Sequence, residues 1–175
     1  MSFWRNRFLL SSALAVCCIG SLLLPGCGSK YPATVPVSGK VTWRGDPVEK
    51  AIVTFSRGAK DIALGEVAIG STDADGRFEL TTHFAGQASG KGALPGDYEV
   101  TISKPVPPPG IAPEHYRVMV EAARKIGESG APVPPAQQPP ALVEMFPQHF
   151  SAAGKSRLKF TVPPAGTTAA DFAIE

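Results

Sequence analysis

The sequence predicts an antiparallel β-sandwich, on three observations. Apolar and polar residues alternate with a period of two in five or six short segments, turn-forming residues separate these segments, and strands do not alternate with helices. A period of two places one face of each strand against a core and the other face in solvent. Short strands with frequent turns favour two packed sheets over a parallel sheet with crossover helices.

The alternating segments cover most of the chain after residue 35. In residues 97–103, DYEVTIS, three apolar side chains share one face. The other segments are residues 35–43, 51–56, 77–81, 157–162 and 172–175, and the turn signals between segments are residues 44–47, 73–76 and 94–97. The expected core residues are Tyr98, Val100, Ile102, Leu158, Phe160 and Phe172, with Val53 and Phe55 opposite them.

Residues 105–147 interrupt the strand pattern and hold eleven of the 18 prolines. Such a density of proline excludes a long helix or a central strand in the proline-rich parts. Between them, residues 113–127 place Tyr116, Met119, Val120 and Ala123 at the spacing of one helix face. We expect a three-turn amphipathic helix that ends at Gly127. Its apolar stripe packs on the sandwich in the first interpretation and on a partner protein in the second, and in the third the helix forms only partly.

The N-terminus has the order of a secretory signal peptide. Arg5 and Arg7 precede an uncharged apolar stretch over residues 8–24. The sequence Leu-Pro-Gly-Cys that follows resembles a bacterial lipobox, with cleavage before Cys27 and a diacylglycerol thioether on its sulfur. An ordinary signal peptide with a chance cysteine, or an uncleaved N-terminal helix, are the alternatives. Gly28 after the cysteine resembles the pattern that allows export to an outer membrane, so either membrane is open.

Cleavage changes the charge and the chemistry of the chain. Removal of residues 1–26 from 175 leaves 149 residues, with a tether over 27–35 and one domain over 36–175. The removed segment holds two of 17 basic residues and none of 15 acidic ones, so the net charge becomes zero. We therefore expect no nucleic-acid partner. Cys17 and Cys18 leave with the signal, so no cysteine remains for a disulfide or a nucleophile.

Three stretches of sequence carry a family resemblance. VPVSGKVTWRGDPVEKAIVTF, STDADGRFELTT and GALPGDYEVTISK occur in this order, and a tail follows from MFPQHF to DFAIE. Together they resemble the carboxypeptidase regulatory-like, transthyretin-like domain of small bacterial lipoproteins, over about residues 35–104 and 142–175. Phe150 and Ile174 stand where that family has tyrosine and leucine. The resemblance implies a seven-stranded Ig-like or transthyretin-like sandwich outside the cytoplasm, without catalysis of its own.

Residues 71–80, STDADGRFEL, are the strongest candidate for a metal site. A calcium loop of the EF-hand type needs a first acidic ligand and a glutamate at position 12, where this chain has Ser71 and Thr82. Only Asp73 and Asp75 fit that pattern. We interpret the segment as a hairpin turn, in which Asp caps backbone amides and Gly76 adopts a positive φ. Weak calcium binding by the two aspartates is the alternative.

Other chemistry has weaker signals. His83, His115 and His149 are far apart in sequence and lack the spacing of metal ligands. The glycine-rich residues 86–92 resemble a phosphate loop, but the spacing is short and glycine follows the lysine. Hydroxyisourate hydrolases, which share the transthyretin-like fold, end in Tyr-Arg-Gly-Ser, whereas this chain ends in DFAIE. We expect neither a cofactor nor a catalytic residue.

These observations together predict a lipid-anchored, non-catalytic module of the cell envelope, facing the periplasm or the cell exterior. Its partners are the membrane, through Cys27, and an envelope protein, glycan or wall component. The alternative is an accessory subunit or a hydrolase whose site is assembled only in space.

Overall fold

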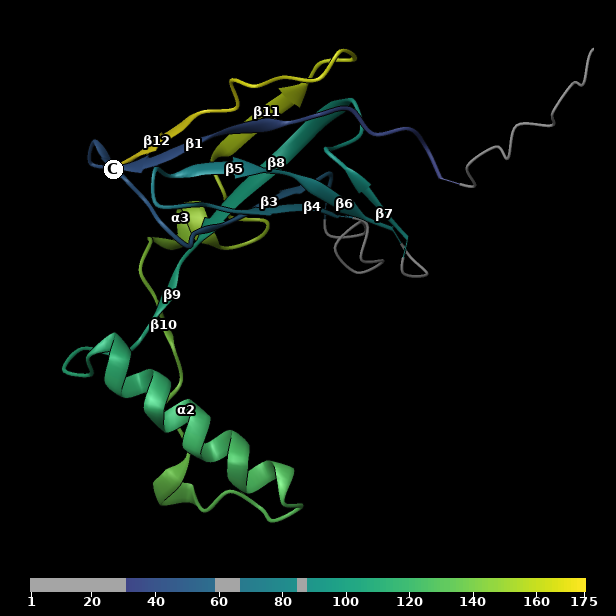
Figure 1. The fold of residues 1–175 in the computed structure, drawn as a ribbon. Helices are drawn as coiled ribbons and strands as arrows, with labels where there is room; N and C mark the ends of the chain where they lie inside the picture. The colour runs from purple at the N-terminus through teal and green to yellow at the C-terminus, as the bar shows by residue number, and fades with distance from the viewer. Residues whose placement is uncertain (1–30, 59–66, 85–87) are drawn as a thin grey trace, which may run out of the picture. The chain divides into compact units, whose positions relative to one another are not determined.

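The structure is a computed structural model that describes residues 31–58, 67–84 and 88–175. The predicted signal peptide, the lipobox and Cys27 lie outside the described residues. One sheet has six strands and another has four, and a single hydrophobic core holds side chains from both (Figure 1). The predicted all-β sandwich is confirmed.

The larger sheet is antiparallel throughout. Its strand order is β11 (Leu158–Val162), β8 (Gly96–Ser103), β3 (Ile52–Ser56), β4 (Val67–Ser71), β6 (Thr81–His83) and β7 (Ser89–Lys91). Phe55 pairs with Val100 and Val53 pairs with Ile102 in neighbouring strands. The expectation that Val53 and Phe55 lie opposite the other core residues holds only for Phe172, which is in the smaller sheet, and is wrong for those of β8 and β11. Both pairs bury their side chains on one face of the same sheet.

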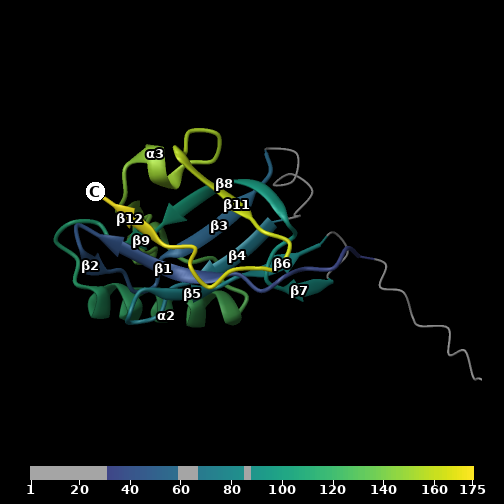
Figure 2. The ribbon, with the colours of Figure 1, turned by 90° about the horizontal axis from the view of Figure 1, so that it is seen from above.

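The smaller sheet is built around β1 (Ser38–Trp43), which pairs with β2 (Asp46–Pro47), β5 (Arg77–Glu79) and β12 (Phe172–Ile174). The pairing with β12 is parallel, with Val41 beside Phe172, so the sandwich is not antiparallel throughout. A parallel pair needs a connection that crosses over, because a tight hairpin always reverses the chain. Here residues 163–171 carry the chain from the six-stranded sheet to the edge of β1, as the yellow segment in Figure 2 shows.

The described residues form eight strands when the two-residue strands β2, β9 and β10 are left out and β5 and β6 are counted as one, close to the expected number of about seven. β5 and β6 form one extended run, interrupted only at Leu80. β5 pairs with β1 whereas β6 pairs with β4, so this run passes from one sheet to the other. The run therefore connects the two sheets covalently, and its second half lies between β4 and β7.

An aromatic cluster fills the centre of the core. Phe55 has no exposed surface, and its ring centroid lies 5.6 Å from those of Tyr98 and Phe160 and 6.0 Å from that of Phe172. Of the expected core residues, Phe160 and Leu158 are only half-buried. They lie on β11, the outer strand of its sheet, and an edge strand has a neighbour on one side only. The other expected core residues are buried.

The insert leaves the sandwich as a two-stranded ribbon of β9 (Pro105–Val106) and β10 (Val143–Glu144). It holds α2 (Pro113–Glu128) and the short 3₁₀ helix η1 (Pro135–Gln137), and α3 (Gln148–Ser151) follows it. α2 has 16 residues, more than the three turns expected. It passes through the predicted stop at Gly127 because the residue with positive φ is Gly130.

The expectation that the apolar stripe of α2 packs on the sandwich is wrong. No residue of α2 is buried, and the element that packs against it is η1. The hydroxyl of Tyr116, a stripe residue, donates to the carbonyl oxygen of Pro140 at 2.9 Å. Tyr116, Met119 and Ala123 are half-buried, whereas Val120 of the same stripe is exposed, so the stripe only partly faces the returning proline-rich part of the insert.

The burial of the two rings predicts a difference between two alanine substitutions. Phe55→Ala should lower the free energy of unfolding by about 3–5 kcal/mol, because it leaves a cavity between the sheets. Phe160→Ala should lower the free energy of unfolding by about half as much, because the Phe160 ring is only partly buried. Urea unfolding followed by tryptophan fluorescence measures both. Equal losses would contradict the position of β11 at the edge of the sheet.

Candidate functional site

The turn at residues 72–76 is built around the carboxylate of Asp73. Its Oδ1 accepts the backbone amides of Asp75 at 2.9 Å and Arg77 at 2.8 Å, and its carbonyl oxygen accepts the amide of Gly76 at 3.0 Å. An aspartate that satisfies amides two and four residues ahead is the usual device of a tight turn. Asp73 therefore has a structural role that needs no ion.

The turn differs from the predicted hairpin in what it connects. It joins β4 of the six-stranded sheet to β5, which pairs with β1 of the other sheet. The two strands that flank it are therefore not partners in a ladder. Thr72 fixes the start of this crossing, because its hydroxyl accepts the amide of Ala51 at 2.7 Å and is buried.

Gly76 has φ of +75°, as the turn prediction required. A Cβ atom at this position would lie 2.5 Å from the carbonyl oxygen of Val41, which belongs to β1. The amide of Val41 in turn donates to the carbonyl oxygen of Gly76 at 2.8 Å. The turn is thus packed directly against the central strand of the smaller sheet, with no room for a side chain.

The structure does not bring the candidate metal ligands close together. His83 lies in β6, His115 in α2 and His149 in α3, and His149 stacks against Phe150 with centroids 4.1 Å apart. Among residues 31–58, 67–84 and 88–175, no three histidine, cysteine, aspartate or glutamate side chains are placed to share a metal ion.

A polar hollow of about 670 Å³ lies beside the turn, over β1 and β5. Lys40 and Arg77 supply positive charge, and Asp73, Glu79 and Asp171 supply negative charge. Two of these carboxylates are already bound to backbone, since Oδ1 of Asp171 accepts the amide of Lys40 at 2.8 Å. The charged and hydroxyl groups that line the hollow could hydrogen-bond a polar ligand such as a glycan.

The second candidate surface is the exposed side of α2. Val118 is 67% exposed and Val120 is 41% exposed, and together with Ala122 they line a hollow of about 500 Å³. The charged residues Arg117, Glu121 and Lys125 line the same hollow. Exposed apolar side chains bordered by charged ones are typical of protein-binding surfaces. Val120 belongs to the predicted stripe, whereas Val118 and Ala122 lie outside it and were not predicted to form a surface.

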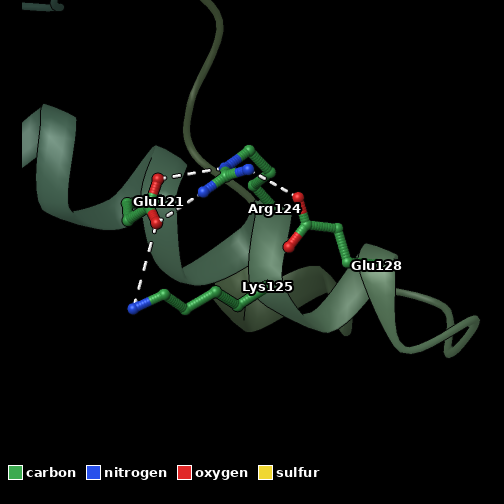
Figure 3. Close-up of polar contacts among 4 residues, drawn as sticks. All are labelled: Glu121, Arg124, Lys125 and Glu128. Atoms are coloured by element: carbon green, nitrogen blue, oxygen red, sulfur yellow. Dashed lines mark hydrogen bonds and ion pairs between the residues drawn. The ribbon is translucent and has the colours of Figure 1, made fainter.

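Ion pairs between its own side chains stabilise α2, which has no buried residue. Arg124 donates through Nε and Nη2 to the two oxygens of Glu121, at 3.0 and 2.8 Å, and through Nη1 to Glu128 at 2.5 Å (Figure 3). These bonds lower the pKa of the Glu121 carboxyl and raise the pKa of Arg124. Lys125 adds a longer contact of 3.9 Å to Glu121. Ion pairs three or four residues apart on one face of a helix support a helix that has no buried side chain.

Glu99 has a structural role that the sequence did not indicate. Its Oε1 accepts the amide of Gly154 at 2.6 Å, and its Oε2 pairs with Nζ of Lys159 at 3.0 Å. Its side chain is 19% exposed, and the hydrogen bond from Lys159 is the main reason that the pKa of the Glu99 carboxyl is lowered. Glu99 thereby ties the connection between α3 and β11 to the sheet.

Comparison of the chain with protein-family models, with curated proteins and with solved structures finds no match. Within the described part of the chain, no helix combines the length and the apolar character needed to cross a membrane. The function of the chain therefore has to be inferred from the hollow over β1 and β5 and from the exposed side of α2.

The turn at residues 72–76 predicts a contrast between two neighbouring substitutions. Gly76→Ala should lower the melting temperature clearly, because a Cβ atom there meets Val41 and φ is positive. Asp75→Asn should leave it nearly unchanged, because only the amide of Asp75 takes part in the turn. Differential scanning calorimetry of both variants measures the contrast.

Calcium tests the remaining alternative for this turn. A site without its first and twelfth ligands binds calcium at best in the millimolar range. We therefore expect the same melting temperature in excess chelator and in about 1 mM calcium. A calcium-dependent rise that Asp75→Asn abolishes would show that the two aspartates form a metal site.

The bonds of Glu99 predict an acid-dependent loss of stability. Because its carboxyl has a lower pKa in the folded chain, the stabilisation is present above the unfolded value near 4.5. It disappears as the pH falls through the lower folded value. Glu99→Gln should cost about 1 kcal/mol at neutral pH, and this difference should vanish in acid. Urea unfolding from pH 7 to pH 3 tests this; a difference that is constant with pH would contradict it.

Proposed function

We propose that this chain is a lipid-anchored, non-catalytic module of the cell envelope that binds an envelope protein through its insert, residues 105–147. The lipobox-like sequence before Cys27 supports the anchor. The zero net charge of the processed chain gives no electrostatic reason for a nucleic-acid partner. The β-sandwich architecture is compatible with the resemblance to carboxypeptidase regulatory-like domains.

One observation carries the proposal: α2 is a 16-residue helix without a buried residue. Isolated helices of that length are marginal in water, and most helices in proteins gain their stability from burial of an apolar face. α2 instead contacts its own insert and leaves Val118 and Val120 exposed. Because the helix adds no side chain to the core of the sandwich, its exposed side is free for a partner.

The alternative of a hydrolase assembled in space gains no support from the described residues. The three histidines lie on separate elements, and the hollow over β1 and β5 has two of its carboxylates bound to backbone amides. A glycan remains the second class of ligand, because the hollow over β1 and β5 is lined by charged and hydroxyl groups.

The anchor predicts how the protein fractionates. The native protein should partition with membranes, because two or three acyl chains give stable attachment where one does not. Cys27→Ser should be released in soluble form or left unprocessed. Membrane fractionation with mass analysis of the N-terminus measures both. Equal membrane retention of a processed Cys27→Ser protein would contradict lipidation.

If a partner binds the insert, a crosslinker placed on α2 should capture it. A photo-crosslinking amino acid in place of Val118 should give a discrete adduct in living cells, because this side chain is 67% exposed on α2. The matched control is Ile52, an aliphatic residue of the sandwich that is 41% exposed. The same adducts from both positions, or none from Val118, would contradict binding through the insert.

A further inference from the structure

The residues before β1 are docked on the sandwich; we refer to residues 31–37 as the stem. The ring of Tyr31 stacks on that of Phe84, with centroids 5.0 Å apart and planes 24° apart. The hydroxyl of Thr34 donates to the carbonyl oxygen of Lys91 at 2.7 Å. Val35 and Ala93 exchange both of their backbone hydrogen bonds, at 2.8 and 3.0 Å. Half of the segment expected to be a free tether is therefore part of the fold.

Glycines form the surface that receives the stem. A Cβ atom at Gly92 would overlap the carbonyl oxygen of Val35, and one at Gly90 would lie 2.9 Å from the hydroxyl of Thr34. Gly92 also has φ of +90°. These glycines belong to the sequence that resembled a phosphate loop. Their observed role is to let the backbone of the stem approach the sheet closely.

The docked stem limits how far the sandwich can stand from Cys27. Four Cα-to-Cα steps separate Cys27 from Tyr31, which is at most about 14 Å of extended chain. If residues 31–37 were free, eleven steps would separate Cys27 from Ser38, at most about 40 Å. The shorter reach is less than the length of the sandwich along its strands, whereas the longer one would let any side of the sandwich meet the lipid.

The base of the insert lies at the far end of β1. From Val35 to Trp43 the chain advances about 26 Å, at the rise of an extended strand. The ring of Trp43 contacts that of Phe146, at the end of the insert, with centroids 5.1 Å apart. The stem thus starts at one end of β1, and the insert returns to the sandwich at the other.

We propose that the docked stem orients the sandwich on the bilayer, with the end at Phe84 and β7 facing the lipid head groups and the insert at the end away from them. This orientation rests on the proposed lipidation of Cys27. It presents the exposed side of α2 to partners beyond the membrane surface. The sandwich then acts as a spacer that holds the insert away from the bilayer.

Fluorescence quenching on vesicles tests the orientation. The full lipidated chain is reconstituted into vesicles of phosphatidylethanolamine and phosphatidylglycerol that carry a nitroxide on some head groups. A fluorophore is attached at Ser89→Cys or at Asp46→Cys, two exposed positions at the stem end and the Trp43 end. In the processed chain the introduced cysteine is the only free thiol. We expect strong quenching at position 89 and little at position 46.

The outcomes separate this inference from the proposed anchor. Failure of the protein to float with vesicles would overturn the lipidation of Cys27, and with it the orientation. Flotation with equal quenching at the two positions would overturn the orientation alone. In the triple variant Tyr31→Ala, Thr34→Val and Gly92→Ala, the stacking and the hydroxyl bond are lost and a Cβ atom is placed against the carbonyl oxygen of Val35, which undocks the stem. The difference in quenching should then shrink while flotation persists. A difference that persists unchanged would show that the docked stem does not set the orientation.

Discussion

The contact of Phe55 with three other rings is the interaction on which the rest of the structure depends. Tyr98 and Phe160 come from its own sheet, and Phe172 comes from the smaller sheet. Residues 31–175 contain no cysteine and therefore no disulfide, so this cluster holds the two sheets together. Phe172 is also the residue of β12 that pairs with Val41, so the cluster fixes the C-terminal strand beside β1. The packing of the core and the register of the smaller sheet therefore support each other.

The period of two in residues 97–103 correctly predicted the buried face of β8, because alternation reports directly on which side chains point inward. The same signal could not show that Val53 and Phe55 lie beside that face rather than across from it. Strand order depends on contacts between distant segments, and alternation is local. The parallel partner of β1 was missed for this reason, and so was the change of sheet at Leu80. The turn at Gly76 was predicted because positive φ favours glycine in any context.

The candidate surfaces were harder to predict than the fold. Tyr116, Met119 and Ala123 have helical spacing, and such a stripe normally packs on the nearest large apolar surface. In this chain the proline-rich return of the insert provides that surface, and a sequence pattern contains no measure of this competition. The exposed Val118 lies outside the stripe and carries no periodic signal of its own. The glycines under the stem likewise resembled a phosphate loop, because close approach of a backbone and close approach of a phosphate require the same missing side chain.

The separation of the insert from the core has an energetic consequence. The insert is closed at its base by the short ribbon of β9 and β10 and by the carboxylate of Glu144, which accepts the hydroxyl of Ser103 at 2.6 Å and the amide of Lys104 at 2.9 Å. The entropic cost of closing a loop grows only with the logarithm of its length, by about 0.6 kcal/mol for each doubling. A long insert closed in this way therefore costs the sandwich little more than a short one. The stability of the sandwich and the chemistry of the insert can consequently vary separately, which suits a spacer that carries a binding element.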